Sequence, residues 1–156
     1  MFKTIIWATD GSEAADAALP YVKSLAGGEG HSLVVVHSKE VLRGRAGGYP
    51  MYANEDELQT KIRHQADDLR SSGLDVTLRI ATGAAPGAAQ MIAAVARAFD
   101  GDVIVVGTRG HTAIAGLLLG SVTQRLLHVA PCPVLAVPAL HSPLEVPDRE
   151  MAEVTS

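Results

Sequence analysis

Hydrophobic residues along the 156-residue chain gather in four short runs that have the character of buried strands. These runs cover residues 4–9, 33–38, 103–108 and 133–138. Because they are rich in β-branched residues and show no polar alternation, they are typical of strands covered on both faces, which favours a parallel sheet. Residues 74–80 instead alternate apolar and polar positions, a pattern that predicts a half-exposed strand at a sheet edge.

Helical patterns separate these strands. Apolar positions at helical spacing predict helices over residues 12–26, 54–72, 86–99 and 121–129. Pro20 lies inside the first of them and is expected to kink or break it. The alternation of strands and helices predicts a doubly wound α/β domain, with helices on both faces of the sheet.

Two segments interrupt this alternation. Residues 39–53 carry several glycines and arginines, and we expect a partly mobile surface loop there. Residues 139–156 hold two prolines and four acidic residues against one basic residue, with little periodicity. The chain is therefore expected to consist of one domain over residues 1–138 and an acidic C-terminal tail over residues 139–156.

Composition narrows the class of protein. With 13 basic and 17 acidic residues, the chain offers no positive field for a nucleic acid backbone. No apolar run approaches the roughly 20 residues of a membrane span, and the apolar start is too short for a signal peptide. The single cysteine cannot form an internal disulfide. We expect a cytoplasmic protein that binds neither nucleic acid nor membrane.

The segment richest in candidate chemistry is GTRGHTAIAGLLLGS, residues 107–121, which leaves a predicted strand and enters a predicted helix. Its glycines let the backbone approach a ligand closely, and a helix N-terminus presents free N–H groups to phosphate. Ligands of open parallel sheets bind beyond the carboxyl ends of the strands. The segment is thus a candidate phosphate site; an ordinary connection with turn glycines is the alternative interpretation.

Other common sites have no counterpart in the sequence. No lysine follows a glycine, so a Walker P-loop is absent, as is the G-x-G-x-x-G fingerprint. Asp10, His37 and Ser121 could suggest a hydrolase triad, but Ser121 lacks the G-x-S-x-G elbow. The six histidines show no metal-ligand spacing. We therefore predict no catalytic residue and no metal ligand.

A composite motif carries a family resemblance. It consists of Gly107-x2-Gly110-x9-Gly120-Ser121, preceded by DVIVVGTRG and followed by VTQRLLHVAPCPVLAV, together with the opening TIIWATDGSEAADAAL. Over residues 3–138 the chain resembles the universal stress protein family. The resemblance implies a five-stranded parallel sheet of order 3-2-1-4-5, which places the alternating strand at an edge.

The resemblance also implies a nucleotide site. In nucleotide-binding members the glycines and serine hold ribose and triphosphate, the first strand's end meets the nucleotide, and the second strand's end forms an adenine wall. Carried onto this sequence, the implied cofactor-binding residues are Ala8, Thr9, Asp10, Val36, Ser38, Gly107, Arg109, Gly110, Gly120, Ser121 and Val122. For Asp10, capping of the first helix is the alternative role, and for Arg109 it is simple solvation.

The implied function is ATP binding, with or without Mg²⁺, by a stress-response regulator or binding module. Two alternatives use the same cleft: a slow ATPase or self-phosphorylating enzyme, and a cyclic AMP-binding protein. Family members pair their last strand with a two-fold mate, so the resemblance also implies a homodimer through Val134–Val137.

Overall fold

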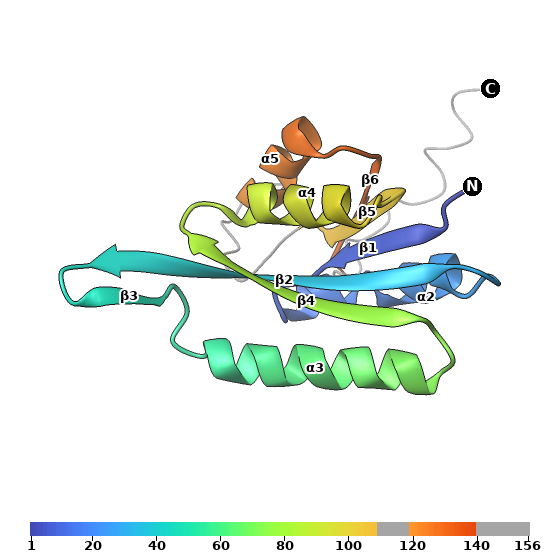
Figure 1. The fold of residues 1–156 in the computed structure, drawn as a ribbon, viewed down its shortest axis with the longest axis horizontal. Helices are drawn as coiled ribbons and strands as arrows, with labels where there is room; N and C mark the ends of the chain where they lie inside the picture. Colours follow the sequence, from blue (N-terminus) through green and yellow to red (C-terminus); the bar gives the residue numbers. More distant parts are fainter. Residues whose placement is uncertain (109–118, 140–156) are drawn as a thin grey trace, which may run out of the picture.

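The computed structural model describes residues 1–108 and 119–139, which form a six-stranded sheet with helices on both faces (Figure 1). In chain order the elements are β1 (Thr4–Ala8), α1 (Glu13–Asp16), α2 (Leu19–Ala26), β2 (Ser32–Gly44), β3 (Gly47–Pro50), α3 (Glu55–Ser71), β4 (Val76–Ala84), α4 (Ala88–Ala98), β5 (Val103–Gly107), α5 (Ser121–Val129) and β6 (Val134–Val137). In the described part of the chain, no helix is long and apolar enough to cross a membrane.

Five of the strands run parallel in the order β4-β2-β1-β5-β6. This is the order that the family resemblance implies. Among the described strands β4 pairs with β2 alone, so the alternating segment does lie at an edge of the sheet. The central strand β1 pairs with β2 on one side and β5 on the other, which explains why it is apolar and buried after Thr4.

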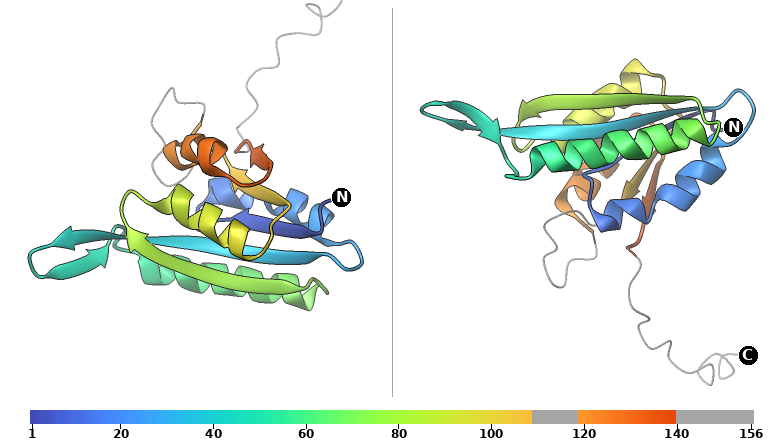
Figure 2. Two further views of the ribbon diagram at one scale, coloured as in Figure 1. Left: turned by 45° about the horizontal axis from the view of Figure 1, so that its top comes forward. Right: turned by 90° about the horizontal axis from the view of Figure 1, so that it is seen from below.

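The expected surface loop over residues 39–53 is wrong. β2 continues to Gly44, and the chain returns as the antiparallel strand β3, which pairs Val41 with Pro50 and Gly44 with Gly47. The sheet is therefore mixed and has six strands. Residues 42–51 are all exposed, so no buried face imposes the alternation that would reveal a strand in the sequence. This hairpin extends well beyond the other strands (Figures 1 and 2).

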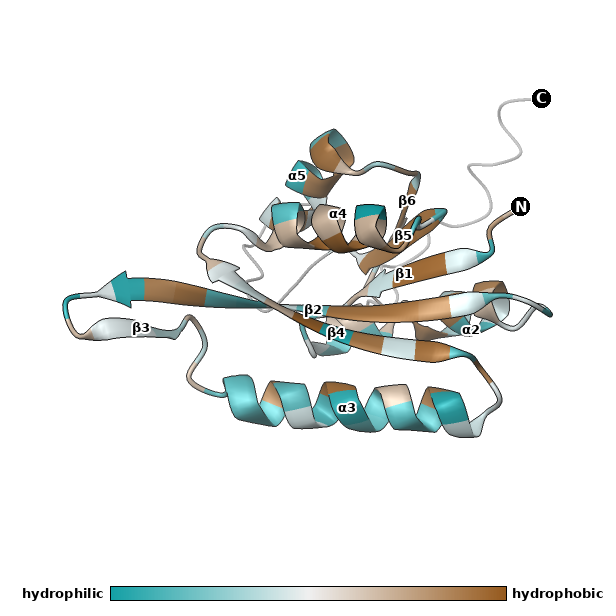
Figure 3. Cartoon of the chain, viewed as in Figure 1, coloured by the Kyte–Doolittle hydropathy of each residue, from teal (hydrophilic) through white to brown (hydrophobic). Residues whose placement is uncertain are grey.

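Two hydrophobic cores lie on opposite faces of the sheet. Ile5 and Trp7 of β1 pack against α2 and α3, whereas Ile6 and Ala8 face α4 and α5. Figure 3 shows apolar residues concentrated along the strands and hydrophilic residues along α3. Because successive strand side chains point to opposite faces, one apolar run serves both cores.

The predicted break at Pro20 is confirmed. α1 ends at Asp16, and α2 begins at Leu19 with Pro20 in its first turn. Proline is tolerated at this position because the first N–H groups of a helix have no intrahelical partner. The other helices match their predictions to within two residues at either end.

Candidate functional site

A pocket opens at the carboxyl ends of β1, β2 and β5, beside the starts of α4 and α5. Eight of the predicted site residues line it: Ala8, Thr9, Asp10, Ser38, Gly107, Gly120, Ser121 and Val122. Nine other lining residues were not predicted as part of the site: Ala15, His37, Glu40, Met51, Tyr52, Ala88, Ile92, Val106 and Thr123.

Three predicted residues do not line the described pocket. Arg109 and Gly110 lie outside the described residues. The side chain of Val36 is fully buried in the core beneath α4. Its backbone still contributes to this edge, since the Val36 carbonyl oxygen accepts a hydrogen bond from Thr9 N at 2.9 Å.

The turn after β1 holds Asp10 at the pocket. Asp10 Oδ1 accepts hydrogen bonds from the backbone N–H of Ser12 at 3.0 Å and from its hydroxyl group. Ser12 Oγ in turn accepts from Ala15 N at 3.2 Å and so caps α1. Gly11 has a φ of +77°, and a Cβ there would lie 3.0 Å from Leu58 Cδ2. Asp10 thus both lines the pocket and braces the helix start.

Helix α3 clamps the same turn from outside. Lys61 Nζ donates to the Gly11 carbonyl oxygen and to Asp16 Oδ2, each at 2.7 Å. Gln65 Nε2 donates to the other Asp16 oxygen at 2.8 Å. These contacts fix the turn that carries Asp10 relative to the helix below it.

A buried histidine–glutamate pair lies at the wall of the pocket, and our sequence analysis did not predict it. The ring of His37 is 2% exposed, and Glu55 at the start of α3 is 3% exposed. His37 Nε2 lies 2.6 Å from Glu55 Oε1, and Nδ1 lies 3.1 Å from the Thr9 carbonyl oxygen. Gln59 Nε2 also donates to Glu55 Oε1 at 3.0 Å. The pair therefore ties α3 and β2 to the end of β1.

The base of the hairpin forms another wall. Glu40 Oε2 accepts a hydrogen bond from Gly87 N at 3.1 Å, and the Glu40 carbonyl oxygen accepts one from Met51 N at 2.9 Å. Burial raises the pKa of the half-buried Tyr52 hydroxyl, and the carboxylates of Glu40, Asp10 and Glu55 raise it further. Tyr52 therefore keeps its proton at neutral pH and can donate a hydrogen bond.

The opposite wall is the N-terminus of α5. Gly120 precedes the helix in an extended conformation (φ −66°), and within the described residues no side chain caps this end. The first N–H groups of a helix lack intrahelical partners and attract anions. Ser121 and Val122, the first two residues of α5, both line the pocket. Thr123 Oγ1 donates to the Gly107 carbonyl oxygen at 2.9 Å and joins the helix to β5.

Comparison with known proteins identifies the family to which this chain belongs. The model of the universal stress protein family matches residues 1–138. The chain belongs to the universal stress protein family. A universal stress protein of Thermus aquaticus is 35% identical, with 88% of this chain and 99% of that protein covered. The universal stress protein MJ0577 of Methanocaldococcus jannaschii is 28% identical, with 88% and 95% covered.

Solved structures show the same fold. The structure of MJ0577 matches with a TM-score of 0.68 and 26% identity, over 91% of this chain and 99% of that one. A universal stress protein solved in complex with cAMP matches with a TM-score of 0.63, over 89% of this chain and 98% of that one. Its sequence is 23% identical, so this likeness concerns the fold.

Proposed function

We propose that this universal stress protein binds ATP in the pocket at the carboxyl edge of its sheet and acts as a nucleotide-dependent regulator or binding module. The observation that carries the proposal is that two walls of the pocket differ in chemistry. The uncapped start of α5 suits phosphate, and Asp10 on the opposite side suits ribose hydroxyl donors. Family membership supports it.

In this proposal each wall has a separate task. The backbone N–H groups of Ser121 and Val122 bind phosphate oxygens, and the glycines before them leave room for close approach. Apolar side chains such as Ile92 and Val106 contact the base. The described residues contain no group of three His, Cys, Asp or Glu that could hold a metal ion. Phosphate oxygens and water would therefore supply most ligands of a nucleotide-bound Mg²⁺.

A slow ATPase or self-phosphorylating enzyme is the second candidate. Catalysis of phosphoryl transfer requires cationic groups and metal ions around the γ-phosphate. No Lys or Arg is among the described residues that line the pocket, and Lys61 nearby is paired with Asp16. These described residues favour binding of a triphosphate over its hydrolysis.

Mass spectrometry of the purified protein is expected to detect bound ATP. In a second experiment, the substitution Gly120→Val should weaken ATP binding by more than about tenfold. A branched side chain before α5 would obstruct the phosphates, while φ at Gly120 suits any residue, so the fold should persist. Calorimetry measures the affinity. Gly44→Val in the hairpin is the matched control, since its Cβ would lie 3.0 Å from the flexible Tyr49 ring and in ordinary contact, at 3.5 Å, with the Gly47 carbonyl oxygen. Unchanged affinity in Gly120→Val would contradict the proposed site, and bound ADP would favour the ATPase.

We also propose a homodimer through β6. Among the described strands β6 pairs with β5 alone, and Val134, Leu135 and Ala136 remain partly exposed. An open apolar edge strand is a ready surface for pairing with a second copy. Light scattering should give twice the chain mass of 16.3 kDa, and a monomer mass at every concentration would refute the dimer. We further propose that the protein is cytoplasmic and that residues 139–156 form a tail separate from the domain.

A further inference from the structure

The pocket is electrically asymmetric. We call Asp10, Glu40 and Tyr52 the acidic wall: Asp10 follows the central strand β1, and Glu40 lies on β2, across β1 from β5 and α5. Glu40 is fixed there by its hydrogen bond from Gly87 N at 3.1 Å. Burial raises the pKa of the Tyr52 hydroxyl, and the carboxylates of Glu40 and Asp10 raise it further.

Among the described residues, little opposes this negative charge. None of the described residues that line the pocket is a lysine or an arginine. The nearby Lys61 is bound to Asp16 and to the Gly11 carbonyl oxygen. A ligand can therefore place an anionic group against α5, but an anionic group against the acidic wall meets like charge in a partly desolvated site.

The chemistry of the ribose determines which nucleotides a pocket with these two walls would bind. A 5′-nucleotide carries its charge on the 5′ side and presents 2′ and 3′ hydroxyl donors on the other. A 3′,5′-cyclic monophosphate has lost the 3′ hydroxyl donor and brings its phosphodiester charge to that edge of the ribose. With the phosphates directed to α5, the ribose hydroxyl edge turns to the acidic wall, where Glu40 and Asp10 can only accept hydrogen bonds while they are ionised.

We infer that the acidic wall makes this pocket select 5′-nucleotides with free ribose hydroxyls and reject 3′,5′-cyclic monophosphates. The inference rests on the proposed nucleotide site and names its ligand class. Its residues Glu40 and Tyr52 come from the hairpin base and the segment that follows it, outside the glycine-rich segment. A like charge within about 6 Å in such a site lowers affinity by about tenfold or more.

The test compares 5′-AMP with 3′,5′-cyclic AMP by calorimetry on the full chain at one ionic strength, with ATP as the probe of the proposed function. The wild-type protein should bind 5′-AMP at least about tenfold more tightly than cyclic AMP. Glu40→Gln keeps an oxygen that can accept from Gly87 N but removes the charge. It should reduce this ratio at least about threefold, mainly by tightening cyclic AMP binding.

Glu29→Gln is the matched control, because it removes the same charge from an exposed position before β2, at the amino end of the parallel strands. It should leave the ratio unchanged. Equal binding of the two nucleotides by the wild type, or equal changes in Glu40→Gln and Glu29→Gln, would overturn the inference while ATP binding upholds the proposed function. Failure of all three nucleotides to bind would overturn both.

Discussion

Replacing His37 with leucine should lower the free energy of unfolding by about 3–5 kcal/mol. The substitution leaves the Glu55 carboxylate, 3% exposed, with Gln59 as its one remaining partner among the described hydrogen bonds. An uncompensated buried charge is among the most costly defects in a protein interior. Urea unfolding with linear extrapolation measures the loss.

The double variant His37→Leu/Glu55→Leu is the informative comparison. Because it removes both members of the buried pair, its cost should fall below that of His37→Leu alone. Asp67→Asn breaks the exposed Asp67–Arg70 ion pair and serves as the control, with an expected change within about 0.5 kcal/mol. Glu55→Leu alone completes the cycle, and if the losses of the two single variants simply add in the double variant, then the pair is not the unit that stabilises this part of the fold.

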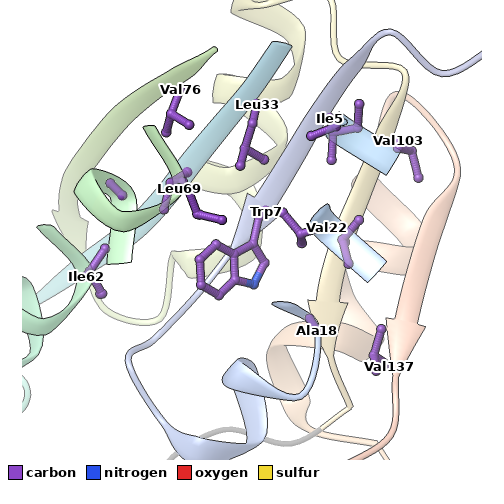
Figure 4. Packing of buried hydrophobic residues seen from close by; sticks show 14 residues of the cluster. Ile5, Trp7, Ala18, Val22, Leu33, Ile62, Leu69, Val76, Val103 and Val137 are labelled. Atoms are coloured by element: carbon purple, nitrogen blue, oxygen red, sulfur yellow. The ribbon is translucent and has the colours of Figure 1, made fainter. Parts of the chain in front are cut away.

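Trp7→Ala should cost about 3–5 kcal/mol, because it empties the centre of the core beneath α2 and α3. Trp7 is fully buried and lies among Ile62, Ala18 and Val22 (Figure 4). Its indole Nε1 has no hydrogen-bond partner within the described ranges. Trp7→Phe therefore breaks no hydrogen bond and should cost much less than the alanine variant.

Far-UV circular dichroism during thermal unfolding can follow both Trp7 variants, since Trp7 is the only tryptophan and its fluorescence is lost. Ile104→Val in the opposite core removes one methylene group and should cost about 0.5–1.5 kcal/mol. Equal losses for Trp7→Phe and Trp7→Ala would contradict the expectation that filled ring volume governs the stability of this core.

The parallel part of the fold could be predicted because burial on both faces leaves a strong sequence signal. β1 and β5 are buried along nearly their whole length, so their apolar runs identify them directly. Strand order came from the family resemblance, because apolar runs alone do not say which strands are neighbours. β3 was missed because its four residues are exposed and have no core to imprint a pattern.

The site was predictable where it follows from the backbone path. Asp10 and Ser121 stand at a strand end and a helix start, positions that a motif can locate. The contact between His37 and Glu55 joins residues 18 apart, on different elements, and no local pattern announces it. Glu40 and Tyr52 both line the pocket because the β2–β3 hairpin brings the chain back to its base. Without a prediction of the hairpin, these two residues therefore could not be predicted from the sequence.

The hairpin has a consequence for how the molecule can be altered. Residues 42–50 contribute no buried side chain, and the hydrogen bond from Met51 N to the Glu40 carbonyl oxygen closes its base. Cleavage after Arg43 or Arg45, or insertion of a short peptide at this tip, would leave the pairing of β2 with β4 over Leu33–Val41 and both cores intact. Since Met51 also lines the pocket, a reporter group attached at the tip would be joined to the pocket through the short pairing of β2 with β3.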